Sequence, residues 1–359
     1  MPVRARVEFA LTRAWTGRGP LACALLPLSW LYALGHAIYG GLYRSGVLRS
    51  WRVGLPVIVV GNLYAGGTGK TPLVIELVRE LKARGWRPGV ISRGYGRMSG
   101  DVRPVEAGAH ASEVGDEPLL IAQAAAVPVV VGADRVAAAR VLHSLNPKCN
   151  VIVCDDGLQH PRLARNVEIA VLHFRGIGNG WRLPAGPLRD SLQRLRSVDA
   201  VVLNGEVPPL RIHGQVFKMN AELDEVYSVA DPGRRAPLAS LVDEQRRTGT
   251  RIVAAAGIAT PEKFFAMLRA AGLTIDEVPL PDHYDFAVSP FFSREYDVAL
   301  VTEKDAVKCR ASAAMRTDGR LCAVSLRTRV EPALVDLIEA KITPKARTDE
   351  PATNGPSPA

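Results

Sequence analysis

The feature that most constrains this chain is a glycine-rich stretch, GNLYAGGTGKTP, at residues 61–72. A short apolar run of the kind that forms a β-strand precedes it at residues 56–60, and apolar residues with helical spacing follow it at residues 72–84. A strand, a glycine-rich loop and a helix in this order suit phosphate binding, because the loop and the helix N-terminus present backbone N–H groups to an anion. The sequence therefore predicts a phosphate-binding loop inside an α/β fold.

The predicted nucleotide-binding residues are the eight that lead into this helix, and two of them have side-chain roles. Lys70 is expected to neutralise charge on the outer phosphates during catalysis, and the Thr71 hydroxyl is expected to bind Mg²⁺. The usual form of the loop has glycine where this chain has Tyr64. A glycine-rich turn with a chance Gly-Lys-Thr is the alternative interpretation. The predicted set is Tyr64, Ala65, Gly66, Gly67, Thr68, Gly69, Lys70 and Thr71.

A second candidate element is the apolar run VIVCDDGLQH at residues 151–160. Ligands of open α/β sheets bind outside the carboxyl ends of the strands, which is where Asp155 and Asp156 are expected. Adjacent side chains of a strand point to opposite faces, so either aspartate is a candidate Mg²⁺ ligand while the other orients the loop. Gln159 is predicted to complete the metal or water shell.

Strands and helices alternate along most of the remaining chain, which predicts a mainly parallel sheet covered by helices on both faces. The predicted fold class is α/β, with a P-loop NTPase-like domain, a smaller α/β domain, a β-ribbon linker between them and an N-terminal membrane-associated helical segment. The predicted boundaries are 1–52 for the hydrophobic segment, 53–205 for the P-loop domain, 206–250 for the linker, 251–343 for the second domain and 344–359 for a disordered tail.

The N-terminal segment is a mostly apolar run at residues 21–43, interrupted by Pro27 and by Gly40-Gly41. Four interpretations are a signal peptide, a transmembrane helix, an interfacial helical hairpin and a buried helix of the core. A signal peptide would carry a nucleotide-dependent protein away from its nucleotide. The interruptions inside the run favour an interfacial segment over a spanning helix.

The formal net charge of +9 shows that the chain is basic. Such an excess fits a phosphorylated substrate, an anionic membrane or nucleic acid. The sequence has neither zinc-ligand spacing nor interleaved aromatic and basic residues, so nucleic-acid binding rests on charge alone. We predict no nucleic acid and no obligate protein partner.

Taken together, these elements resemble the tetraacyldisaccharide 4'-kinase family, the lipid A 4'-kinases of Gram-negative bacteria. The resemblance runs from the hydrophobic segment to the last domain, and it makes Tyr64 the family's own form of the loop. It rests on GNLYAGGTGKTP, ISRGYGR, GDEPLLIA, VGADR, CDDGLQH, RLPAGPLRD, DHYDF and VTEKDAVK.

The resemblance implies transfer of the γ-phosphate of ATP to the 4'-hydroxyl of a lipid disaccharide 1-phosphate, giving lipid IVA, with Mg²⁺ as cofactor. It implies two α/β/α domains joined by a β-ribbon, with an N-terminal helix docked on the cytoplasmic face of the inner membrane. The catalytic aspartate of the GDEP motif becomes Asp116, and the supporting histidine of the DHYDF-type loop becomes His283. The sequence does not determine the nucleotide preference, although the position of VTEKDAVK is compatible with a loop that contacts the nucleotide base.

Five basic residues are candidates for contacts with the substrate or with a phosphate, although each also fits a surface position. They are Arg93, Arg97, Arg135, His160 and Arg189. The competing function is a membrane-associated P-loop ATPase or switch protein, which the phosphate loop and the aspartate pair alone would permit. The hydrophobic N-terminus and the GDEP and DHYDF loops favour the kinase.

Overall fold

The computed structural model describes residues 11–97, 99–106, 108–210, 212–282 and 284–343. The predicted disordered tail and His283 therefore lie outside the described residues. The strands form one mixed, mostly parallel sheet, to which β9 (Arg235–Pro237) adds by pairing with β8. The order across the sheet is β11 (Asp276–Pro279), β10 (Ile252–Ala256), β12 (Val298–Thr302), β13 (Leu321–Val330), β8 (Gln215–Ser228), β7 (Ala200–Asn204), β6 (Val167–His173), β1 (Val57–Gly61), β5 (Val151–Asp155), β2 (Pro88–Ser92), β4 (Val129–Val131) and β3 (Arg103–Pro104).

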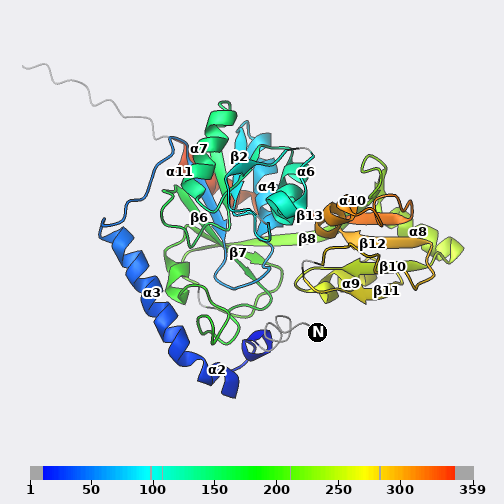
Figure 1. Ribbon diagram of the computed structural model, residues 1–359, viewed down its shortest axis with the longest axis horizontal. Helices are drawn as coiled ribbons and strands as arrows, with labels where there is room; N and C mark the ends of the chain where they lie inside the picture. The colour runs from blue at the N-terminus through cyan, green and yellow to red at the C-terminus, as the bar shows by residue number, and fades with distance from the viewer. Residues whose placement is uncertain (1–10, 98, 107, 211, 283, 344–359) are drawn as a thin grey trace, which may run out of the picture.

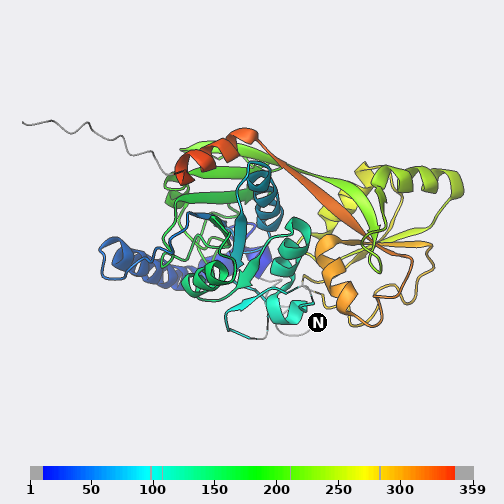
Figure 2. The ribbon, with the colours of Figure 1, turned by 90° about the horizontal axis from the view of Figure 1, so that it is seen from above.

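The sheet belongs to two lobes, which are visible side by side in Figure 1. The first lobe is built on β1 to β7, and the second lobe is built on β10 to β12. Strands β8 and β13 are long enough to reach from one lobe to the other, as Figure 2 shows from above. Strand β8 pairs in parallel with β7 at its start and antiparallel with β13 over the rest of its length, which joins the lobes through the sheet itself.

Helices cover both faces of each lobe. In the first lobe, α4 (Lys70–Ala83), α6 (Asp116–Ala125) and α11 (Pro332–Ile342) pack on one face and α7 (Arg135–Leu145) on the other. In the second lobe, α8 (Leu238–Thr248) and α9 (Pro261–Ala270) cover one face and α10 (Glu303–Ala311) the other. The central strands are buried along their whole length, as the continuous apolar runs predict.

The sequence-based prediction of an α/β fold is confirmed, and the strand and helix predicted on either side of the glycine-rich loop are β1 and α4. Helix α4 begins at Lys70 instead of residue 72, because Pro72 fits within the first turn of a helix, where its missing N–H needs no partner. The segment after Arg189 contains a 3₁₀ helix, η1 (Leu192–Arg196). The predicted linker contains β8 and α8, and the last helix, α11, packs in the core of the first lobe.

The apolar N-terminal run forms α2 (Pro20–Ala24) and α3 (Leu26–Arg44), which lie along the outside of the first lobe (Figure 1). The expected interruptions do not break α3, since Pro27 lies in its first turn and Gly40-Gly41 lie within it. In the part of the chain that the structure describes, no helix is both long enough and apolar enough to cross a membrane. Large apolar side chains point outward from α3, which excludes a fully buried core helix. They are Leu28, Trp30, Leu31, Leu34 and Ile38.

Candidate active site

The glycine-rich loop between β1 and α4 leaves a row of backbone donors open. In the described part of the chain, the N–H groups of Gly66, Gly67, Thr68 and Gly69 have no hydrogen-bond acceptor. Gly69 has φ of +89°, and a Cβ there would lie 2.1 Å from the Asn204 amide nitrogen, so only glycine fits. The loop therefore presents unpaired N–H groups next to the positive end of a helix, which is the arrangement that binds phosphate.

Asn62 organises this loop from below, and the sequence analysis did not single it out. Its fully buried amide nitrogen donates to the Tyr64 carbonyl at 2.7 Å and to the Thr68 hydroxyl at 2.9 Å. Its amide oxygen accepts from Lys70 Nζ at 3.2 Å. An asparagine between an apolar strand and a glycine-rich loop was the available signal, because a buried amide needs partners that only the loop can supply.

The structure places the Tyr64 side chain beneath the loop. It is 4% exposed, and its ring lies edge-on to the ring of His173 with 5.1 Å between the centroids. Burial and the charge of Arg175 lower the pKa of His173 to about 4, so the imidazole is neutral at physiological pH. Within the predicted nucleotide-binding set, Tyr64 therefore supports the loop by packing.

Asp156 binds two of the positively charged candidate residues, Arg189 and Lys70. Arg189 donates to both of its carboxylate oxygens at 3.0 Å, and Lys70 Nζ lies 3.3 Å from Oδ1. Burial by itself raises the pKa of Asp156, but Lys70 and Arg189 outweigh burial and lower that pKa to about 2. This aspartate therefore holds Lys70 and Arg189 at the mouth of the loop.

Asp155 differs from Asp156 both in its hydrogen bonds and in its pKa. Its Oδ2 accepts a hydrogen bond from the Ser92 hydroxyl at 3.0 Å, whereas its buried Oδ1 has no hydrogen-bond partner among the residues described. Burial, followed by the charge of Glu117, raises the pKa of Asp155 to about 7. An unpaired buried carboxylate oxygen fits a cation, so Asp155 is the better candidate for Mg²⁺.

The other donors expected around the metal fit this arrangement. Thr71 lies in the first turn of α4, and Gln159 donates to the Asn62 carbonyl at 2.9 Å, which fixes Gln159 against the loop. The described residues contain no group of three or more His, Cys, Asp or Glu side chains able to hold a metal.

Asp116 lies where the two lobes meet. It is the first residue of α6 and is buried, and its Oδ2 lies 3.7 Å from Lys304 Nζ and 3.9 Å from Lys308 Nζ, both on α10. Burial opposes the charge on Lys304, but Glu117, Asp116 and Asp282 outweigh burial and raise the pKa of Lys304. Figure 2 shows α6 and α10 adjacent across the junction.

Lys304 and Lys308 belong to the VTEKDAVK motif, so the motif contacts the candidate catalytic aspartate. Their partner lies far away in the sequence, which is why the motif alone did not reveal the contact. A cavity of about 1140 Å³ opens beside them between the lobes. Its lining includes Tyr95, His110, Asp116, Asp282, Asp285 and Lys308.

Three of the five basic candidates are drawn together. Burial lowers the pKa of Arg97, and its two terminal nitrogens have no hydrogen-bond partner among the described residues. Burial and the charge of Arg135 lower the pKa of His160 to about 4. Arg135 itself donates to the Asp156 carbonyl at 3.3 Å. Arg189 lies on Asp156, and Arg93 is exposed at the end of β2.

Comparisons with known proteins agree over nearly the whole chain. A family model for tetraacyldisaccharide-1-P 4'-kinase matches residues 21–343. A tetraacyldisaccharide 4'-kinase of Janthinobacterium sp. (strain Marseille) is 46% identical over 344 residues, covering 94% of this chain and 97% of that protein. One of Herminiimonas arsenicoxydans is 47% identical over 348 residues, with the same coverage of 94% and 97%. The crystal structure of LpxK from Aquifex aeolicus in complex with ATP is similar with a TM-score of 0.76 and 30% identity, covering 90% of this chain and 99% of that one.

Proposed function

Because the chain belongs to the tetraacyldisaccharide-1-P 4'-kinase family, we propose that it transfers the γ-phosphate of ATP to the 4'-hydroxyl of a tetraacyldisaccharide 1-phosphate in lipid A biosynthesis. The observation that carries this function is the pairing of two features. An open phosphate loop with Lys70 held by Asp156 lies in the same lobe as Asp116, which lines a large cavity. The first feature suits a donor and the second an acceptor.

On the donor side, the open N–H groups of residues 66–69 would bind the phosphates of ATP. Lys70 and Arg189 would neutralise the charge that develops as the γ-phosphoryl group leaves ADP, and Asp156 holds both cations in place. Asp155 and Thr71 would hold Mg²⁺, which would supply positive charge to neutralise and orient the phosphates.

On the acceptor side, Asp116 would act as the base. The 4'-hydroxyl oxygen attacks the γ-phosphorus, the bond from that phosphorus to the bridging oxygen of ADP breaks, and the hydroxyl proton passes to the Asp116 carboxylate. The ammonium groups of Lys304 and Lys308 stabilise this carboxylate. The assignment of His283 as a supporting residue rests on the resemblance of the DHYDF loop.

The basic cluster of Arg97, Arg135 and His160 would bind the phosphate that the acceptor already carries. Asp101 lies 3.9 Å from one terminal nitrogen of Arg97, but the buried donors of Arg97 have no hydrogen-bond acceptor among the described residues, which favours an anionic ligand. The loop that carries Arg97 packs against the start of α6, since a Cβ on Gly115 would lie 3.0 Å from the Tyr95 carbonyl. This packing keeps the cluster near Asp116.

The outward apolar side chains of α3, together with Arg44 and Arg49 at its end, support peripheral docking on an anionic membrane surface. For an enzyme that uses ATP, this surface would be the cytoplasmic face of the inner membrane. We also propose two domains joined by the β8–β13 ribbon. The P-loop domain would comprise residues 53–205 and α11, and the smaller domain would be built on β10 to β12.

The test is transfer of radiolabel from γ-labelled ATP to a tetraacyldisaccharide 1-phosphate in phospholipid–detergent micelles. We expect labelled lipid from the wild type, and a loss of about 100-fold or more in Asp116→Asn with nucleotide affinity retained. Asp224→Asn, at an exposed position on β8, is the matched control and is expected to keep full activity. Phosphate release without labelled lipid would favour the ATPase alternative, and near-normal transfer by Asp116→Asn would exclude Asp116 as the base.

A further inference from the structure

Residues 182–190, here called the bridging segment, lie between α3 and the phosphate loop and contact both. On the loop side, the Ala65 N–H donates to the Pro187 carbonyl at 2.8 Å, and the Arg189 N–H donates to the Leu63 carbonyl at 2.7 Å. Tyr64 forms an isolated antiparallel β-bridge with Leu188. The bridging segment therefore forms one wall of the phosphate loop.

On the helix side, three polar residues of α3 hold the same segment. Ser29 Oγ accepts from the Ala185 N–H at 2.9 Å and donates to the Arg182 carbonyl at 3.0 Å. The Tyr32 hydroxyl donates to the Arg189 carbonyl at 2.8 Å. His36 Nδ1 lies 3.7 Å from Asp190 Oδ1.

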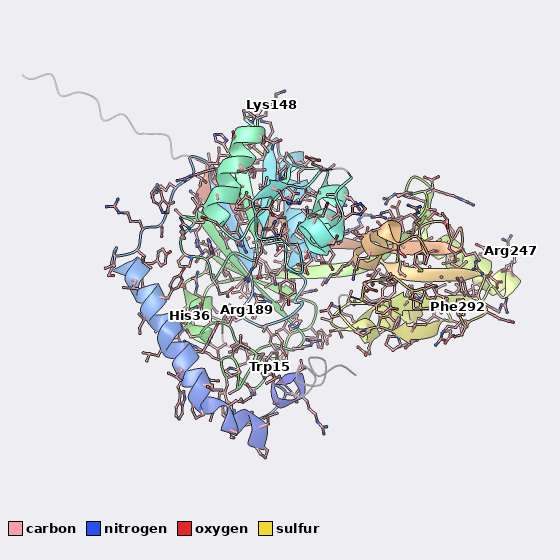
Figure 3. The ribbon with its side chains drawn as sticks, in the orientation of Figure 1. Trp15, His36, Lys148, Arg189, Arg247 and Phe292 are labelled. Carbon is pink, nitrogen blue, oxygen red and sulfur yellow. The ribbon has the colours of Figure 1, made fainter. Side chains whose placement is uncertain are left out.

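These three residues share one face of α3. Their spacing of three and four positions places Ser29, Tyr32 and His36 in a row, and Figure 3 shows His36 on the side of the helix that faces Arg189. The side chains of Leu34 and Ile38 are exposed on the opposite side. The helix thus has one face for the bridging segment and another for a surface outside the protein.

Arg189 connects this helix to the phosphate site. Its backbone is held by Tyr32 on one side and by Leu63 on the other, and its side chain binds Asp156. Asp156 in turn lies 3.3 Å from Lys70. A continuous chain of polar contacts therefore runs from the middle of α3 to the lysine of the phosphate loop.

We propose that Ser29, Tyr32 and His36 are positioning residues that couple α3 to the phosphate loop, so that docking of α3 on an anionic phospholipid surface tightens ATP binding. The inference rests on the proposed function for the identity of the nucleotide. A docked α3 holds the bridging segment in one position, and the phosphate loop then loses less conformational freedom when it orders around phosphate. By linkage, nucleotide binding must tighten vesicle binding by the same factor.

The experiment uses the full chain and no turnover. A fluorescent, non-hydrolysable ATP analogue with Mg²⁺ is titrated with and without vesicles of phosphatidylethanolamine and phosphatidylglycerol, and vesicle binding is measured by co-sedimentation with and without the analogue. For the wild type we expect each ligand to tighten the binding of the other by about 3- to 10-fold, the range of one hydrogen bond.

Tyr32→Phe keeps the ring and removes only the hydroxyl, and Ser29→Ala is the second variant. Both are expected to lose the mutual tightening while binding vesicles as the wild type does in the absence of nucleotide. Tyr39→Phe is the control, because it removes a hydroxyl of the same helix that interacts with Tyr43 instead of the bridging segment. This variant is expected to keep the mutual tightening.

Equal nucleotide affinity with and without vesicles in the wild type would overturn the proposal, as would full tightening in Tyr32→Phe. Because the readout is binding, mutual tightening without labelled lipid in the transfer assay would refute the kinase function alone. Labelled lipid without mutual tightening would refute the coupling alone.

Discussion

The two lobes share a strand, a turn and a helix at matching places, but the turn after the strand is built differently in each. In the first lobe, β1 runs into a loop whose N–H groups at residues 66–69 have no acceptor in the described chain. In the second lobe, β10 runs into Gly257, whose N–H donates to Asp305 Oδ2 at 2.9 Å. The first N–H group after β10 is therefore paired with a fully buried carboxylate of the same lobe.

The difference also decides where the charges of the second lobe act. Lys308 lies 3.3 Å from Asp305 and 3.9 Å from Asp116, so it belongs to both lobes. The second lobe therefore contributes cations to the candidate base of the first lobe. Similar α/β units can have different roles, depending on the side chains that their turns and helices carry.

The largest expected effect comes from removing the ammonium group of Lys70 from the phosphate loop of the first lobe. Lys70→Ala should lower the rate of phosphoryl transfer by about 100- to 1000-fold, because the charge on the leaving phosphates loses its nearest ammonium group. Steady-state kinetics of label transfer measures this effect. Lys148→Ala, at an exposed position after α7, is the matched control (Figure 3). Unchanged kinetics in Lys70→Ala would contradict the phosphate-loop assignment.

The next largest effect is on the stability of the second lobe. Asp305→Asn should lower the free energy of unfolding by about 3 kcal/mol, because it leaves Lys308 without the charge of a fully buried partner. Urea denaturation of the full chain measures the change. Asp243→Asn, on the exposed face of α8, should change stability by less than about 0.5 kcal/mol. A result for Asp305→Asn as small as this control would show that the second lobe does not depend on its own carboxylate.

A smaller effect is the pH dependence of stability that His173 contributes through its packing against Tyr64. The pKa of His173 is lowered to about 4 from 6.5, so the unfolded chain binds the extra proton first as the pH falls. Stability is therefore retained above about pH 6.5 and is lost as the pH falls toward 4, with about 2 kcal/mol lost at pH 5.

Replacing His173 should remove its contribution to the pH dependence of stability. His173→Leu should flatten the stability curve between pH 6.5 and pH 4 relative to the wild type, as measured by urea denaturation across that range. His143→Gln, at an exposed position on α7, should leave the curve unchanged. An unaltered slope in His173→Leu would mean that the ring accepts a proton in the folded protein without penalty.

The sequence predicted the parts of the molecule that local chemistry determines. The phosphate loop follows from its glycines, and the strand before Asp155 follows from its apolar run, because both patterns are complete within about ten residues. The family resemblance is confirmed, since the matching family model covers residues 21–343. The sequence did not predict Asn62 as the organiser of the loop, because its partners are defined only once the loop has folded.

The sequence also did not predict contacts between segments that are far apart in the chain. Lys304 and Asp116 meet only because two lobes close on one another, and the packing of α11 in the first lobe follows from the path of β13. The segment that contains β8 was predicted as a β-ribbon linker, but its pairing with β13, far along the chain, was not predicted. Such pairings leave little local trace in the sequence.

The ribbon between the lobes has a mechanical consequence. Residues 220–223 of β8 pair with residues 326–329 of β13, and the register shifts between Val324 and Leu326, next to this section. A two-stranded ladder tolerates a wider range of twist than a broad sheet. Torsion of this section would rotate one lobe about the strand direction with every main-chain hydrogen bond intact. The gap beside Asp116 would then widen or narrow with the angle between the lobes, once the ion pairs of Lys304 with Asp116 and Glu117 open.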